Sequence, residues 1–151
     1  MAQDYYDILQ PFDHIIELLD DSKAALGLAY IAENDENLIP QYPAVLVQTD
    51  NVRRQYHATG VFIVYFHLDL WVFHAELSSS SAVRSRKDVQ LATDIRKLLH
   101  ANRQLGGHII DSLVDGEFPG ISGRVIDSNM RTIVTTRLTW VGENRVPYEA
   151  A

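Results

Sequence analysis

The sequence predicts a single-domain α+β protein with a mostly antiparallel sheet, a long central strand, an N-terminal helix and one central helix. Three observations support this prediction. One amphipathic helix pattern lies near the N-terminus and another lies at 88–102. Between them runs an unusually long apolar segment, GVFIVYFHLDLWVFHAEL at 60–77. The 151 residues are enough for one hydrophobic core and favour one domain over the whole chain, 1–151.

The composition excludes several classes of chemistry. The chain has no cysteine, which rules out disulfides, thiol catalysis and cysteine-ligated metal sites. The formal net charge of −7 disfavours nucleic-acid binding through an overall positive field. MAQDYYDIL at the N-terminus has two acids and no basic residue, so we expect no secretory signal. Charged and histidine side chains interrupt the apolar segment and argue against a membrane span.

Residues 1–23 are expected to hold the first helix. Its apolar residues recur at spacings of three and four: Ile8, Phe12, Ile15, Ile16 and Leu19. Pro11 should lie in the first turn, where proline is tolerated. For 24–39 the sequence predicts a short strand near 28–32 and a polar turn at 33–37, ENDEN.

Two prolines precede the next predicted strand, which covers 44–48. Pro43 should stand at the first residue of this strand, where no backbone donor is needed. TDNVRRQY at 49–56 is predicted to be a polar connection. The residues 57–78 should then form one extended segment, which would span about 60 to 70 Å at roughly 3.3 Å per residue.

This extended segment is apolar on both faces. Even-numbered apolar residues should line one face, and the other should carry Val61, Ile63, Tyr65, Trp71 and Phe73. Because helices can cover only one face, we expect further sheet or a second subunit to cover the other. A strand of this length must bend, bulge or project beyond its own core.

Residues 78–87, SSSSAVRSRK, are low in complexity and are predicted to form a mobile loop. The central helix should follow over 88–102, with Leu98 and Leu99 among its buried side chains. Gly106 and Gly107 should provide its left-handed stop.

Strands at 108–114, 121–126 and 132–141 should complete the sheet, with a turn at 115–120. On the last strand we expect Thr135, Arg137 and Thr139 to face away from the core. The residues 142–151 are predicted to form a C-terminal tail that reaches a neighbour.

The sequence shows no arrangement typical of catalysis. His67 and Asp69 share one strand face whereas His74 points to the other, so these three cannot close one metal site. Phosphate-binding loops, nucleophile elbows and zinc-peptidase motifs are missing from the sequence. We therefore predict no enzyme, and no catalytic, metal-binding or cofactor-binding residue. The alternative from a different class is a small enzyme that uses His57 or His67 with a nearby acid.

Arg84, Arg86 and Lys87 form the main basic cluster. They could contact DNA phosphates or an acidic protein, and the acidic balance of the chain favours a protein partner. We expect this cluster, together with Trp71 and Phe73 of the long strand, to contribute to contacts with other subunits or with a tube.

The order of these features resembles the tail terminator proteins of long-tailed bacteriophages, also called tail completion or tail-to-head joining proteins. The resemblance covers roughly 42–141. It rests on YPAV at 42–45, DIRKLLH at 94–100 and LGG at 105–107. It implies a mixed α/β subunit that forms a hexameric ring, caps the tail tube, stops its polymerisation and presents a surface to the head connector.

The resemblance also implies partners and a location. These are a homo-oligomeric ring, the tail tube protein, a head-completion protein, and DNA that passes through the lumen without specific binding. The protein would reside at the head-proximal end of the virion tail, after assembly in the host cytoplasm. Structural roles are implied for Pro43, Leu98, Leu99, Gly106 and Gly107, and no cofactor is implied. Another neck or connector protein of the head-tail junction is the nearest alternative.

Overall fold

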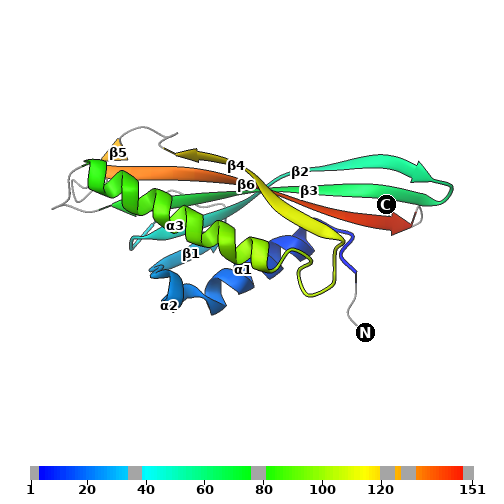
Figure 1. The fold of residues 1–151 in the computed structure, drawn as a ribbon, viewed down its shortest axis with the longest axis horizontal. Helices are drawn as coiled ribbons and strands as arrows, with labels where there is room; N and C mark the ends of the chain where they lie inside the picture. Colours follow the sequence, from blue (N-terminus) through cyan, green and yellow to red (C-terminus); the bar gives the residue numbers. More distant parts are fainter. Residues whose placement is uncertain (1–3, 34–38, 76–80, 120–124, 127–131, 148–151) are drawn as a thin grey trace.

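One mixed sheet organises the protein, and the predicted α+β class is confirmed. The order of its strands is β1 (Tyr30–Glu33), β2 (Ala44–Ala58), β3 (Val61–Ala75), β6 (Thr132–Pro147) and β4 (Asp111–Pro119). The short strand β5, Val125–Ile126, pairs with β6 beside this path. Two main helices, α1 and α3, pack against one face of the sheet (Figure 1). The structure is a computed structural model that describes residues 4–33, 39–75, 81–119, 125–126 and 132–147.

The central strand β3, Val61–Ala75, pairs antiparallel with β2, Ala44–Ala58, on one side and with β6, Thr132–Pro147, on the other. Its even-numbered side chains form the middle of the core: Val64, Phe66, Leu68, Leu70 and Val72. Most odd-numbered side chains of β3 are half-buried and lie outside this core. The alternation predicted for this segment is therefore confirmed.

Strand β2 is longer than predicted. The segment 49–56, predicted as a connection, continues the strand to Ala58, and a turn at Thr59 and Gly60 then leads into β3. The extended segment predicted for 57–78 is thus two strands joined at this turn. The prediction was wrong because this half of β2 is a sheet edge exposed on both faces, so its sequence needs no apolar alternation. Gly60, with φ of 79°, permits the left-handed turn.

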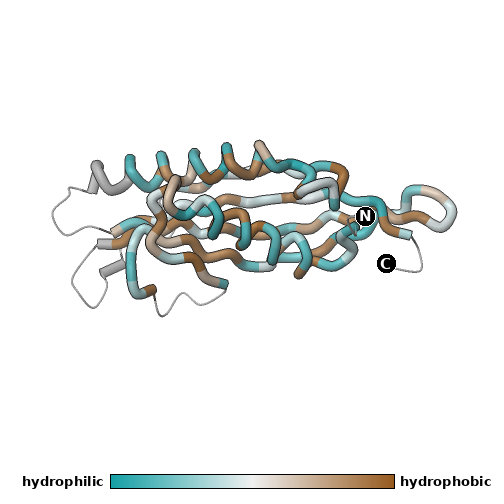
Figure 2. Tube along the Cα trace, turned by 90° about the horizontal axis from the view of Figure 1, so that it is seen from below, coloured by the Kyte–Doolittle hydropathy of each residue, from teal (hydrophilic) through white to brown (hydrophobic). Residues whose placement is uncertain are grey.

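Beyond the edge strands β1 and β4, three strands continue as an arm, defined as residues 48–58, 61–66 and 143–147, in which Val64 and Phe66 still belong to the core (Figures 1 and 2). The parallel edge strand β1, Tyr30–Glu33, ends its pairing with β2 at Val47. On the other side, β4, Asp111–Pro119, begins its pairing opposite Glu143. Register shifts interrupt the β2–β3 pairing twice. The extra residues at these shifts lie on β2, so the predicted bulge falls on the neighbouring strand, while β3 itself projects beyond the edge strands as predicted.

Helix α1, Leu9–Asp21, buries Phe12, Ile15 and Leu19 against the sheet, and Pro11 lies in its first turn as predicted. In Figure 2 the helices alternate between hydrophilic and hydrophobic segments, as expected for helices with one buried side. The short helix α2, Lys23–Leu26, follows and leads to β1. The strand predicted near 28–32 is found as β1, which extends to Glu33, whereas 34–37 of the predicted polar turn lie outside the described residues.

Helix α3, Ser81–Ala101, begins before the predicted start at 88. The mobile loop predicted for 78–87 is wrong over 81–87, and 78–80 lie outside the described residues. The helix is anchored by residues from Asp88 onward, and adding further turns to an anchored helix avoids the unfavourable nucleation step. Leu99 is buried and Leu98 packs half-buried against the core, in agreement with the sequence.

The turn after α3 contains Gly106 and Gly107 with φ of 71° and 89°. Their predicted left-handed conformation is confirmed, although they lie in the turn and not directly at the helix end. Pro43 stands immediately before the first residue of β2, and its carbonyl accepts a hydrogen bond of 2.8 Å from the backbone N–H of Ala29.

Two further predictions are wrong. The turn predicted for 115–120 is part of β4 up to Pro119, because a register shift between Val114 and Gly116 lets the strand continue through the glycine. The tail predicted for 142–151 is the end of β6 over 142–147, held by pairing with β3 as far as Val61 opposite Pro147. The remaining residues, 148–151, lie outside the described part.

Gly142 generates a stability prediction. A Cβ atom at this position would overlap the indole ring of Trp140, which is 1% exposed. We expect Gly142→Ala to lower the free energy of unfolding by about 1–3 kcal/mol, the usual cost of overpacking a core. Denaturant unfolding measures this. Val141→Ala, which shortens the half-buried neighbouring side chain, is the control and should cost less. Equal stability of Gly142→Ala and the natural protein would contradict the prediction.

Candidate interaction surface

The sheet face turned away from α1 and α3, called the outer face below, carries the most distinctive group of side chains. It is defined by the odd-numbered residues of β3 and by the residues paired with them on β2, β6 and β4. One row crosses four strands, because Leu46 pairs with Trp71, Trp71 with Arg137, and Arg137 with Phe118. These residues are far apart in the sequence and are brought together by strand register alone.

Arg137 lies between two aromatic rings in this row. Its guanidinium carbon is 5.5 Å from the ring centroid of Trp71 and 5.8 Å from that of Phe118. Its Nη2 also donates to both carboxylate oxygens of Asp69, at 3.1 and 3.2 Å. Cation–π attraction and a partly buried ion pair together fix the guanidinium in one place.

Burial affects the acidic partner of this pair. Asp69 is 7% exposed, and desolvation raises the pKa of its carboxyl group in spite of the opposing effect of the Arg137 contact. Arg137 therefore acts as a counter-ion that a buried carboxylate requires. Neither residue is available as a general acid or base without breaking this pair.

Neighbouring polar contacts make the row rigid. The indole N–H of Trp71 donates to the Gln48 side chain at 3.2 Å, and the Thr139 hydroxyl lies 2.5 Å from an Asp115 carboxylate oxygen. At Gly116 a Cβ would lie 2.8 Å from Phe118 Cε2, so glycine is what allows that ring to fold back toward Arg137. The result is a preorganised aromatic and cationic patch.

The exposure of side chains to solvent varies across the outer face. Leu46 and Thr135 are buried, whereas the odd-numbered side chains of β3 from Trp71 to the arm are mostly half-buried. Toward β4, Leu113 and Phe118 are 49% and 45% exposed. Apolar side chains that reach solvent on this scale, contiguous along several strands, are typical of a surface that another molecule covers.

The residues predicted to form interfaces do not all lie together. Trp71 and Phe73 share the outer face, as predicted from the alternation. Arg86 and Lys87 are exposed on α3, which packs on the opposite side of the sheet, and Arg84 lies in the first turns of the same helix. The structure thus places Trp71 and Phe73 on one surface and Arg86 and Lys87 on another.

Sequence reasoning placed Arg137 on the outward face of its strand but did not identify its role. The pairing of Arg137 with Trp71 and Phe118 depends on the order of β3, β6 and β4 in the sheet. Strand alternation predicted on which face of the sheet each side chain lies. No signal in the sequence predicted which residues of the neighbouring strands lie beside Arg137.

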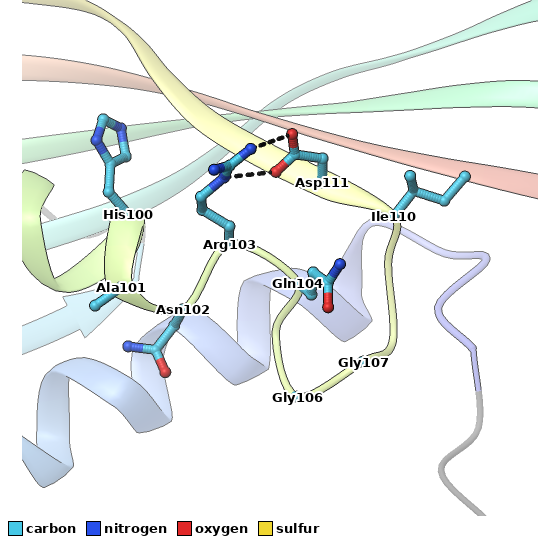
Figure 3. Close-up of a pocket in the computed structure, with 9 residues that line it drawn as sticks. All are labelled: His100, Ala101, Asn102, Arg103, Gln104, Gly106, Gly107, Ile110 and Asp111. Carbon is cyan, nitrogen blue, oxygen red and sulfur yellow. Dashed lines mark hydrogen bonds and ion pairs between the residues drawn. The ribbon is translucent and has the colours of Figure 1, made fainter.

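A second feature is an open depression of about 690 Å³ beside the C-terminal end of α3 (Figure 3). Its most polar contact is the pair Arg103–Asp111, in which Nε and Nη2 donate to the two carboxylate oxygens at 2.8 and 2.7 Å. Hydrogen bonding to Arg103 lowers the pKa of Asp111. His100 Nε2 accepts from the backbone N–H of Val114 at 3.0 Å. Because Arg103 and Asp111 are bonded to each other and His100 to the backbone of β4, these groups hold the turn in place.

A third feature is an aromatic cluster at the base of the arm. The Tyr5 hydroxyl lies 2.8 Å from His14 Nδ1, and the Tyr5 ring stacks on His108 with centroids 4.2 Å apart. Desolvation and the nearby His108 lower the pKa of His14. Asn144 donates from its side chain to the Tyr5 carbonyl at 2.8 Å, so this cluster attaches the N-terminal segment to β6.

The two histidines that the enzyme alternative would use do not lie in an enclosed site. His57 is exposed on the arm, and His67 is half-buried on the outer face. The acid nearest in sequence to His67, Asp69, is bonded to Arg137. Within the described ranges, no three metal-ligating side chains converge.

None of the described helices has the length and apolar content needed to cross a membrane. The sequence matches no known protein-family model. A search of curated proteins also finds no significant match. The function of the protein is therefore inferred from the sequence features and from the surfaces described above.

Asp88 is a buried titratable group with a consequence for stability. It is 1% exposed, its Oδ2 accepts a hydrogen bond of 2.7 Å from the Thr136 hydroxyl, and its Oδ1 has no partner among the described residues. Burial raises the pKa of Asp88 to about 7. The folded protein therefore holds this proton at pH values where the unfolded chain, with the ordinary value of 3.8, has lost it.

We expect the protein to lose stability as pH rises from about 4 to about 7, because unfolding then releases the Asp88 proton. The loss from this group is at most about 4 kcal/mol. Asp88→Asn, which carries no charge at any pH, should equal the natural protein near pH 4 and exceed it near pH 8. Denaturant unfolding across this range, with half-buried Asp94→Asn as a less buried control on the same helix, measures the difference. A difference that does not grow with pH would contradict the assignment.

Proposed function

We propose that this protein is a structural subunit that assembles into a ring at the end of a bacteriophage tail tube, ends tube polymerisation and provides a surface for joining the head. The observation that carries the proposal is the outer face, where aromatic and aliphatic side chains of one sheet reach solvent around a fixed arginine. The order of sequence features, which resembles tail terminator proteins, supplies the identity of the assembly.

The composition of the outer face suits a protein–protein contact. Trp, Tyr, Phe and Arg are enriched at interface cores, and Trp71, Tyr65, Phe73, Phe118 and Arg137 all lie here. The ion pair and the two flanking rings hold Arg137 before any partner arrives. Such preorganisation lowers the ordering cost of binding.

A second copy of the chain is the occupant we propose for the outer face. The two faces of the sheet differ, since one is covered by helices and the other is half-exposed over much of its area, so contacts between copies can join unlike surfaces. Unlike contacts that close by rotation form rings, whereas those that do not close form filaments. A ring that binds the last tube subunit but lacks the surface needed for further addition would stop tube growth.

The double variant Trp71→Ser/Phe73→Ser tests the role of the outer face. We expect it to fold and to lose self-association, because both aromatic anchors are removed from a surface that contributes little to the core. Size-exclusion chromatography with light scattering should show a multiple of the 17.1 kDa subunit for the natural protein, near six copies if the ring is hexameric. The variant should elute as a monomer.

Val89→Ser is the matched control, because Val89 is an exposed apolar residue, 37% exposed, on α3 at the opposite side of the sheet. It should assemble as the natural protein does. Unchanged assembly of the double variant would count against the outer face as the subunit contact. Some rings form only on the tube, so the same comparison is repeated in the presence of isolated tail tubes.

The basic cluster on α3 provides a separable test of tube attachment. Because it lies on the helical side of the sheet, Arg84→Ala/Arg86→Ala/Lys87→Ala should still self-associate but should bind tail tubes less well. Electron microscopy of tubes grown with each protein measures capping and tube length. Tubes that the variant caps at the natural length would exclude this cluster from the contact. If the protein is labelled and found on head connectors but not at tube ends, the alternative function, another neck or connector protein, would be favoured.

A further inference from the structure

The tip of the arm, residues 53–63 and 143–147, is basic and carries exposed aromatic surface. Arg53, Arg54 and Arg145 are exposed. Within these two ranges Glu143 is the acidic residue. The described part of the chain provides no ion pair to the three arginines. Tyr56 is 64% exposed and meets Phe62 edge-on, with ring centroids 6.0 Å apart. The tip therefore combines positive charge with an aromatic anchor.

The outward side of α1 and the segment before it have the opposite charge. Six carboxylates are exposed here, and no lysine or arginine precedes Lys23: Asp4, Asp7, Asp13, Glu17, Asp20 and Asp21. Asp13, Glu17 and Asp21 recur at every fourth residue, which places like charges side by side on one helix face.

The end of α1 adds a further unfavourable interaction. Asp20 and Asp21 lie at its C-terminal end, where the helix dipole is negative, and the last turn has no basic residue. Both arrangements cost stability in an isolated subunit. A cationic partner placed along this helix would relieve them.

We propose that the arm tip binds α1 of a second copy of this chain, so that copies associate head to tail. This inference rests on the proposed ring function and specifies which surfaces meet. The charges of the two surfaces are complementary, and Tyr56 supplies apolar contact area beside Arg54 on the same face of the arm, whereas Arg53 and Arg145 lie on the outer face.

The arm tip of one chain cannot bind α1 of the same chain. Figure 1 shows the arm running past the helices and away from them at one end of the molecule. Each copy therefore carries one basic arm and one acidic helix at separate places. A contact between these two surfaces leaves an unused arm at one end and an unused helix at the other, until the copies close into a ring.

The first test uses two charge-reversed proteins. The arm variant is Arg53→Glu/Arg54→Glu, and the helix variant is Glu17→Lys/Asp21→Lys; all four positions are exposed, so folding should be unchanged. Sedimentation velocity at about 50 mM salt should show that each variant alone associates at least about tenfold more weakly than the natural protein. Circular dichroism and thermal unfolding check that each variant folds.

The decisive measurement is an equimolar mixture of the two variants. In the mixture the arm of the helix variant meets the acidic α1 of the arm variant, and the reversed arm meets the reversed helix. Association should therefore return to nearly the natural level, and a chain that carries all four changes should also associate. Lys97→Glu, an exposed reversal on α3, is the control and should leave association unchanged.

Natural-level association of the arm variant would overturn the inference while leaving a ring built on other contacts intact. Variants that fail to associate even when mixed would also overturn it, because the arm would then bind something other than α1, such as an acidic face of the tube or DNA phosphates. A natural protein that stays monomeric at high concentration in low salt would overturn it as well. The proposed function would in that case depend on the tube-capping experiment alone.

Discussion

The pairing of β3 with β2 as far as Phe73, and with β6 along its whole length, is the constraint on which the remaining structure depends. A strand paired on both sides satisfies its backbone groups without help from side chains, so its sequence is free to be apolar on both faces. Helices α1 and α3 cover the even-numbered side chains and form the core. The odd-numbered side chains are left to the outer face, and the length that exceeds the helices becomes the arm.

Two kinds of surface follow from this constraint, and they differ in the interactions through which each would bind a partner. The outer face is aromatic and holds a cation between rings, so any contact there would gain mainly from burial and from a geometry already in place. The arm tip and the outward side of α1 are charged and exposed, so a contact between them would be long-ranged and sensitive to salt. A ring could use the first for stability and the second for the direction of assembly.

Local patterns predicted much of the fold. The spacing of Phe12, Ile15 and Leu19 predicted α1, and the left-handed conformation of Gly106 and Gly107 was expected from glycine chemistry. The errors have one common cause. The segments 49–56, 81–87, 115–119 and 142–147 contain polar residues, glycine or proline that are typical of loops, yet all are helix or strand. Each is held by an anchored neighbouring segment, and such support cannot be read from composition.

The sequence by itself determined which residues alternate, where the helices bury their apolar stripes and that thiol and disulfide chemistry are excluded, because these properties depend on the residue types and on the helix and strand periods. Only the tertiary structure decided which side chains meet. Asp69 and Arg137 are 68 residues apart, and Trp71 and Phe118 share one guanidinium because β6 lies between their strands. Strand order and register are set by the summed packing of the whole chain, so no local pattern contains them.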